Sequence, residues 1–357
     1  MSRPINALID LSALKHNLSV VRRYAKCARV MAVIKADAYG HGLLRAAEAF
    51  SSADGFAILE IDAAIHLREA GYQHTILLIE GFFSKSELEL FERYQLSAVI
   101  HNSKQLQMLS AYKLSGKLNV FLKLNTGMNR LGFTPEQFLK ALETLQSNSA
   151  IDQITLMTHF ACADNRNDRK EVIEQLQCFN SVVTNYDLPC SLANSAATLQ
   201  YPETHADWVR PGIMLYGASP FSDISASELD LRPSMTFTSE IIAVQNLNAG
   251  DTVGYGQTFC AKQIMRVGIV AGGYADGYPR HAPTGTPVLV NGVRTRIIGR
   301  VSMDMLHVDL SKVANAGIGS PVVFWGKGMP VEEVAQAAGT ISYDLLCSLT
   351  QRVKIKT

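Results

Sequence analysis

The run Thr75-Ile76-Leu77-Leu78-Ile79-Glu80 is apolar at every position between its two polar ends. A strand with one face in water alternates apolar and polar residues, whereas a strand buried on both faces of a parallel sheet is continuously apolar. Seven other short strand-like runs occur in the first two thirds of the chain, at 29–35, 55–59, 97–101, 118–125, 154–160, 190–195 and 209–217. The run around Leu77, which extends over 75–81, is therefore one of eight similar units.

Helical patterns lie between these strands, at 61–70, 84–94, 136–146 and 168–186, and another follows Asp10, a residue suited to cap a helix. Eight alternating strand and helix units predict a (β/α)8 TIM barrel. After about residue 230 the pattern changes to short strands joined by turn residues, at 235–245, 265–271, 287–290, 295–301, 306–310 and 321–325, with one helix at 331–338. We therefore predict a barrel domain over 1–230 and a mainly-β C-terminal domain over 231–357.

Composition narrows the class of protein further. The formal net charge of +1 gives no reason to expect a nucleic-acid or membrane partner. The six cysteines are scattered without the spacing of a metal site, so we expect no metal and buried, reduced thiols. No apolar run approaches the ~20 residues that cross a bilayer. The segment 1–7 lacks the apolar core of a signal peptide, and we expect a cytoplasmic protein.

The predicted barrel also locates a candidate site, because TIM-barrel active sites lie at the C-terminal ends of the strands. Lys35, His159, Ser195 and Arg210 fall at or near the ends of four different predicted strands. In addition, Lys123 lies near the end of the fifth strand, and Arg130 lies in the loop that follows it. We expect these side chains, distant in sequence, to meet at one barrel mouth.

Lys35 carries the most specific chemistry of this group. It lies in Val33-Ile34-Lys35-Ala36-Asp37-Ala38-Tyr39-Gly40-His41-Gly42, where an apolar strand gives way to a Gly-rich turn. A lysine amine in a partly dry cleft has a lowered pKa and becomes available as a nucleophile or base. It is then suited to Schiff-base chemistry with an aldehyde cofactor. The alternative, from position alone, is a lysine that ends a strand and points to water.

The segment 33–42 resembles the pyridoxal-phosphate attachment segment of the alanine racemase family. Further segments similar to that family follow at 123–133, 157–160, 193–195, 209–217, 253–256, 273–280 and 299–305, so the resemblance covers essentially the whole chain. It implies a barrel with a C-terminal β domain, pyridoxal 5'-phosphate as cofactor, and interconversion of L- and D-alanine. It leaves open whether D-alanine supply to peptidoglycan or alanine catabolism is served.

The resemblance also assigns roles to single residues. It implies that Lys35 attaches the cofactor, that Arg210 faces its pyridine nitrogen and that His159 supports this arrangement. The remaining cofactor-binding positions, several of them around the phosphate, are Tyr39, Asn194, Ser195, Gly212, Ile213 and Tyr343.

Racemisation needs two proton-transfer groups on opposite faces of a planar centre. The resemblance assigns these to Lys35, acting on the D-isomer, and Tyr255, acting on the L-isomer. It places Arg130 and the backbone of Met303 at the substrate carboxylate, and it matches Lys123 to a lysine that is often carbamylated. Because Tyr255 and Met303 belong to the predicted β domain, the resemblance implies a homodimer whose active sites are shared between subunits. Two further residues, Tyr274 and Arg280, match positions near the substrate entrance.

Other functions remain open from the residues. A racemase of another small amino acid, such as serine, is the nearest, because a small pocket rejects one hydroxyl only weakly. A decarboxylase of similar architecture typically places a carboxylate at the pyridine nitrogen, which Arg210 speaks against. A pyridoxal-phosphate carrier protein would lack the second domain that contains Tyr255. A metabolite-binding barrel without cofactor is the remaining alternative.

Overall fold

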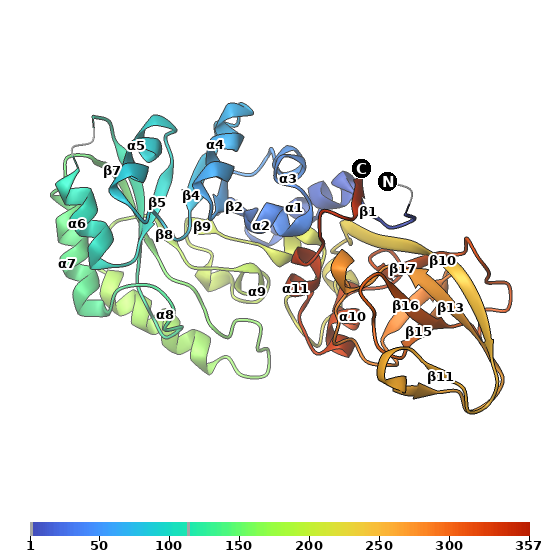
Figure 1. The fold of residues 1–357 in the computed structure, drawn as a ribbon. Coiled ribbons are helices and arrows are strands. Elements are labelled where there is room, and N and C mark those ends of the chain that lie inside the picture. The colour runs from blue at the N-terminus through green and yellow to red at the C-terminus, as the bar shows by residue number, and fades with distance from the viewer. Residues whose placement is uncertain (1–2, 113–114) are drawn as a thin grey trace.

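The computed structural model describes residues 3–112 and 115–357, so Met1 and Ser2 of the N-terminal segment lie outside the described residues. Eight parallel strands close into a barrel, which confirms the (β/α)8 prediction (Figure 1). They are β2 (Arg29–Val33), β3 (Gly55–Ile58), β4 (Thr75–Leu78), β5 (Ser97–Ile100), β6 (Leu118–Lys123), β7 (Ile151–Met157), β8 (Cys190–Ser191) and β9 (Trp208–Val209). The barrel closes where Arg29 and Val30 of β2 pair with Trp208 and Val209 of β9.

The last predicted strand is wrong over most of its length. Only Trp208 and Val209 pair, and the chain then turns into the 3-10 helix η2 (Ile213–Tyr216). Pro211 has no N–H to give to a sheet, and the Gly212 N–H donates instead to the Ser195 hydroxyl at 2.8 Å. The strand predicted at 190–195 is likewise short, because Ser195 begins a helix.

Helices cover the outside of the barrel. They are α1 (Leu11–Tyr24), α3 (Leu43–Ala49), α4 (Ile61–Glu69), α5 (Lys85–Arg93), α6 (Ser103–Ala111), α7 (Pro135–Gln146), α8 (Lys170–Val183) and α9 (Ser195–Gln200), while α2 (Lys35–Gly40) lies at the mouth. Asp10 caps α1 as expected, since its carboxylate accepts from the N–H groups of Ser12 and Ala13.

The C-terminal part is built on an eight-stranded sheet, ordered β13-β16-β15-β14-β17-β10-β1-β18. Its strands are β10 (Met235–Leu247), β13 (Met265–Ala271), β14 (Pro287–Val290), β15 (Val293–Ile298), β16 (Met305–Asp309), β17 (Pro321–Trp325), β18 (Lys354–Lys356) and, from the other end of the chain, β1 (Asn6–Ile9). A small hairpin, β11 (Thr252–Val253) with β12 (Phe259–Cys260), lies along the lower edge of this domain in Figure 1.

The two chain ends meet in this sheet. β1 pairs antiparallel with β10 and parallel with β18. The first strand of the chain therefore belongs to the sheet of the C-terminal domain and not to the barrel. Two helices, α10 (Val331–Ala338) and α11 (Ser342–Cys347), return to the barrel, where α11 packs against α2 at the mouth. The packing is close, because a side chain at Gly40 would collide with the Leu346 carbonyl oxygen.

Two further findings concern the surface. None of the helices within 3–112 and 115–357 is both long and apolar enough to cross a membrane. All six cysteines are free, but the expectation that they are buried is wrong: Cys27, Cys260 and Cys347 are exposed, and the others are half-buried. The exposed ones follow α1, lie in the β11–β12 hairpin and end α11, all of which are surface positions.

Candidate active site

A cavity of about 650 Å³ lies at the C-terminal ends of the barrel strands. The structure brings most of the predicted site residues together there, although they come from seven separate segments of the chain. Those that line it are Lys35, Tyr39, Lys123, Arg130, His159, Asn194, Ser195, Arg210, Gly212, Ile213 and Tyr343.

Lys35 reaches this cavity from a strained turn. The four residues after it, Ala36 to Tyr39, all have φ between +50° and +54°, so they form one turn of left-handed helix. Left-handed backbone costs roughly 1–2 kcal/mol for each L-residue, and such strain persists where the surroundings impose it, often at functional sites. One support is Asp37, whose carboxylate accepts from the Leu43 N–H at 2.7 Å.

A second support for this turn is the buried imidazole of His41. Its Nδ1 lies 3.0 Å from the Ala38 carbonyl oxygen and 2.9 Å from that of Tyr39. Both partners can only accept, so Nδ1 carries the proton and donates. Burial lowers the pKa of His41 to about 4, which keeps the ring neutral. Its Nε2 lies 2.8 Å from the Ser234 hydroxyl, in the segment that leads into β10.

The two lysines of the cavity have lowered pKa values. Burial lowers the pKa of Lys35, and the nearby charge of Arg130 lowers it further. Burial also lowers the pKa of Lys123 to about 8, with the charges of Arg210 and Arg130 acting in the same direction. Four cationic side chains and one carboxylate, Glu80, line the cavity, so positive charge is in excess. The site is suited to hold anions and to keep an amine unprotonated.

Arg210 is a buried cation without a carboxylate partner among the described residues. Its Nη1 donates to the Ser191 hydroxyl at 2.7 Å, and its Nη2 donates to the Thr158 and Leu192 carbonyl oxygens at 2.7 and 3.2 Å. Burial lowers the pKa of Arg210 only to about 10, so the guanidinium stays charged at neutral pH. The Nε atom makes no hydrogen bond within the described part of the chain, and the residue lines the cavity.

His159 lies next to this guanidinium. Burial and the charge of Arg210 hold the pKa of His159 well below its ordinary value, so the ring is neutral. Its Nδ1 is 3.3 Å from Arg210 Nη2 and accepts from it. The histidine therefore helps to fix the orientation of the arginine without adding a charge.

Ser195, Gly212 and Ile213, which line the same cavity as Arg210, form a candidate cradle for an anion. Ser195 begins α9, and the Asn194 side chain caps that helix by accepting from the Ala197 N–H. The Ile213 N–H begins η2 and finds no acceptor among the described residues. Gly212 is required here, since a Cβ at this position would lie 2.6 Å from the Tyr39 hydroxyl. Free N–H groups at helix starts, together with small residues, favour a phosphate.

Two tyrosines complete the cradle. Tyr39 stacks on buried Tyr216 with ring centroids 4.5 Å apart, and the Tyr343 ring of α11 is 6.0 Å away. Burial raises the pKa values of Tyr39 and Tyr343 well above those of free phenols. Both hydroxyls therefore stay protonated and can donate hydrogen bonds.

Tyr255 and Met303 are not in this cavity. Both are on the C-terminal domain, with 69% and 52% of their surface exposed, and neither lines the pocket of its own chain. Tyr255 lies two residues after the end of β11, in the hairpin that joins β11 to β12. The entrance candidates Tyr274 and Arg280 are exposed on the same domain.

The cavity also contains residues that sequence reasoning missed. Glu80 lies two residues after β4 and His101 directly after β5, so the strand-end rule could have found them. The His101 Nε2 lies 3.1 Å from the Glu80 carbonyl oxygen. Cys347 reaches the cavity from α11, and no local pattern indicates that a C-terminal helix returns to the barrel mouth.

Comparison with known proteins agrees with this geometry. The family model for the alanine racemase N-terminal domain matches residues 9–220, and that for the alanine racemase C-terminal domain matches residues 234–357. An alanine racemase of Nitrosospira multiformis is 64% identical over 354 residues, 99% of each chain. One of Nitrosomonas europaea is 61% identical over 356 residues, 99% of this chain and 98% of that one.

Solved structures lead to the same family. The biosynthetic alanine racemase from Pseudomonas aeruginosa superposes with a TM-score of 0.97 at 45% identity, covering 99% of both chains. The alanine racemase from Acinetobacter baumannii gives a TM-score of 0.94 at 40% identity, again over 99% of both. With both family models matched and near-complete coverage of these relatives, the chain belongs to the alanine racemase family.

Proposed function

We propose that this protein interconverts L- and D-alanine with pyridoxal 5'-phosphate as cofactor. One observation carries the proposal: a lysine of lowered pKa, an unpaired buried arginine and an anion cradle face the same barrel-mouth cavity. The D-alanine would serve peptidoglycan synthesis, or the reaction would serve alanine catabolism.

The residues present fit the cofactor. The Ile213 N–H and the tyrosine hydroxyls offer donors to a phosphate, and Gly212 leaves the space that a Cβ would fill. Arg210 offers an Nε–H to a ring nitrogen, and Lys35 offers an amine to an aldehyde. When bound, the cofactor supplies a carbonyl that attaches amines covalently and a ring that withdraws electrons from the α-carbon of an amino acid.

Arg210 favours racemisation over competing reactions of such a cofactor. A guanidinium can donate a hydrogen bond to a ring nitrogen, but with a pKa of about 10 it does not readily transfer the proton. The electron sink is then weaker than it would be opposite a carboxylic acid. With the cofactor bound, this arrangement would favour return of a proton to the α-carbon over transamination. The hydrogen bonds to Ser191, Thr158 and Leu192 keep the guanidinium in this place.

Two groups move the α-proton in our proposal. With the cofactor bound, Lys35 would move the proton on one face and act on D-alanine. Tyr255 serves the other face and acts on L-alanine, with Arg130 and the Met303 N–H at the substrate carboxylate. Because Tyr255 and Met303 lie outside the cavity of their own chain, we infer a homodimer in which they reach the partner's cavity. Their exposure supports this arrangement, since a bare tyrosine and methionine are suited to an interface.

We also propose that Lys123 is carbamylated. A carbamate forms only from the neutral amine, and the lowered pKa of Lys123, about 8, makes that form accessible at neutral pH. The reaction replaces a cation beside Arg130 with an anion. It therefore reduces the excess positive charge of the cavity and orients the arginine for the substrate.

The direct test is a coupled assay of both directions after reconstitution with pyridoxal 5'-phosphate. We expect L- and D-alanine to be interconverted and serine to react with a lower kcat/KM. A protein that cannot bind the cofactor, or that binds it and leaves optically pure alanine unchanged, would refute the proposed function. A higher kcat/KM for serine would reassign the substrate but not the reaction class.

A further inference from the structure

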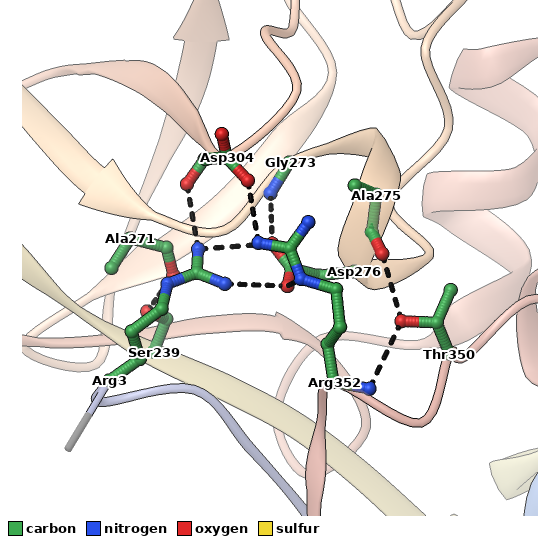
Figure 2. Close-up of polar contacts among 9 residues, drawn as sticks. All are labelled: Arg3, Ser239, Ala271, Gly273, Ala275, Asp276, Asp304, Thr350 and Arg352. Atoms are coloured by element: carbon green, nitrogen blue, oxygen red, sulfur yellow. Dashed lines mark hydrogen bonds and ion pairs between the residues drawn. The ribbon is translucent and has the colours of Figure 1, made fainter. Parts of the chain in front are cut away.

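The C-terminal domain contains a buried carboxylate that the reaction as proposed does not use. Asp276, the last residue of the 3-10 helix η5 (Tyr274–Asp276), has no exposed surface. Its two carboxylate oxygens accept from Arg3 Nη1 at 2.7 Å and from Arg3 Nη2 at 3.1 Å. The Gly273 N–H donates to the same group at 3.0 Å, and Arg352 Nε lies 3.4 Å from it. Figure 2 shows these contacts.

The same two arginines hold the segment Met303–Asp304. Arg3 Nη2 donates to the Asp304 carbonyl oxygen at 2.8 Å, and Arg352 Nη2 donates to the Asp304 carboxylate at 2.5 Å (Figure 2). Arg3 comes from the start of the chain and Arg352 from its end. The cluster of Arg3, Asp276, Asp304 and Arg352 therefore fastens both chain termini to this one segment.

The turn that carries Asp276 lies directly on the backbone of Met303. The Tyr274 N–H donates to the Ser302 carbonyl oxygen at 3.1 Å, and the Ala275 N–H donates to that of Met303 at 3.0 Å. No side chain fits between them, because a Cβ on Gly273 would collide with the Met303 carbonyl oxygen. A shift of the Asp276 turn is thus transmitted to the Met303 peptide without a compressible layer in between.

The Met303 N–H remains available. It has no acceptor among the described residues, and 52% of the surface of Met303 is exposed. We propose that Asp276, clasped by Arg3 and Arg352, is a positioning residue that holds this N–H for the substrate carboxylate in the partner's cavity. The inference rests on the proposed function, in which Met303 acts across the dimer, and adds the group that fixes its position.

Asp276 could instead act on the cavity of its own subunit, and this effect must be distinguished from the effect on the partner's cavity. Thr350 Oγ1 donates to the Ala275 carbonyl oxygen at 2.8 Å, and Ser348 Oγ donates to that of Gly277 at 2.7 Å. These contacts connect the Asp276 turn to the end of α11, whose Tyr343 and Cys347 line the cavity of the same chain. An experiment on mixed dimers separates the two directions.

The first measurement uses the reconstituted D276N enzyme. Because Met303 contributes binding to the substrate carboxylate rather than proton transfer, we expect the KM for alanine to rise about ten-fold with kcat within about two-fold. The visible absorption of the bound cofactor should not change. Hydrogen exchange should become faster in the peptide 299–305. Unchanged exchange together with unchanged KM would overturn the proposal.

Asp309→Asn provides the matched control. Asp309 is also a nearly buried carboxylate of this domain, 8% exposed, and it pairs with Arg296 at the opposite end of β16 from Met303. We expect it to lose similar thermal stability while the KM stays at the wild-type value. If D276N does not fold, R352M is the alternative variant, because it removes one of the two arginines that contact Asp276 and Arg352 is half-exposed. We expect R352M to raise the KM as well.

The second measurement uses dimers of one K35A subunit and one D276N subunit, purified through two different affinity tags. One site of such a dimer combines an intact Lys35 with the intact Met303 segment of the K35A chain. We therefore expect about half of the wild-type kcat/KM, because one of two sites is complete. If Asp276 acts within its own subunit, no site is intact and kcat/KM stays at or below the D276N value, which would overturn the proposal.

A K35A/Y255F dimer tests the proposed function separately. If kcat/KM reaches about half of the wild-type value in this pair but not in the K35A/D276N pair, the role of Asp276 is rejected. The shared active site is still supported in that case. Failure of both pairs rejects the shared site itself, and with it the inference. Recovery of both supports a positioning role for Asp276 in the partner's cavity.

Discussion

The tendency of Lys123 to be carbamylated can be predicted from the fraction of its amine that is neutral. We test it with the substitution Lys123→Met, which keeps the length of the side chain and removes the amine. Burial and two neighbouring guanidinium groups lower the pKa of Lys123 to about 8. At pH 7.5 about a quarter of such an amine is neutral, against about 0.1% for an ordinary lysine of pKa 10.4. The reactive fraction is therefore larger by a factor of about 200.

The pH dependence of this reaction has a definite sign. Carbamate formation consumes the neutral amine and CO2 and releases a proton. At a fixed concentration of dissolved CO2, occupancy should therefore rise with pH, and it should fall steeply as the pH drops below about 8, where the amine also takes up a proton.

The assay is carbon NMR of the protein in labelled bicarbonate. We expect one slowly exchanging carbamate signal in the wild type and none in K123M, with a higher KM for alanine in CO2-free buffer. Lys140→Met is the control, because that side chain is 73% exposed and its hydrogen bond to Glu136 raises its pKa. A signal that survives in K123M, or no signal in the wild type between pH 7 and 8.5, would refute the reasoning.

Three further changes test the site. Lys35→Ala should abolish the visible absorption of the bound cofactor, and a band that borohydride fixes to a different lysine would contradict its role. Tyr255→Phe should keep the cofactor but slow α-proton exchange from L-alanine about 10²–10⁴-fold, with a much smaller effect from D-alanine; equal losses would argue against a two-face division. Gly212→Ala places a Cβ 2.6 Å from the Tyr39 hydroxyl, so the Kd of apoprotein for pyridoxal phosphate should rise about ten-fold or more. The control Gly317→Ala, where a Cβ meets nothing within 4 Å, should leave that Kd unchanged, and an equal Kd in both variants would exclude the cradle.

Much of the fold could be predicted because its information is local. A parallel barrel strand is buried on both faces, so it appears in the sequence as a continuous apolar run such as Ile76 to Leu78. Each strand can therefore be recognised without knowing which strands pair with it. The strand-end rule then selected Lys35, Lys123 and Arg210, which the structure places in one cavity. The same rule would have found Glu80 and His101. The strand predicted at 209–217 was too long, because β9 contains only Trp208–Val209.

Other features depend on contacts between distant parts of the chain. The pairing of β1 with β18, the return of Cys347 to the barrel mouth, and the clasp of Arg3 on Asp276, 273 residues away, leave no periodic signal. The left-handed turn from Ala36 to Tyr39 is also not predictable, because its residues individually disfavour positive φ. It exists because buried His41 and the packing of Gly40 on α11 hold it there.

The sequence by itself determined which segments form strands and helices, and which reactive side chains stand where a barrel strand ends. Burial pattern and turn residues are read from neighbours a few positions apart, so no tertiary contact is needed for that step. Only the tertiary structure decided the electrostatics of the site and the separation of Tyr255 from its own cavity. A pKa depends on desolvation and on charges brought close by folding, and these distances are not contained in any local stretch of the chain.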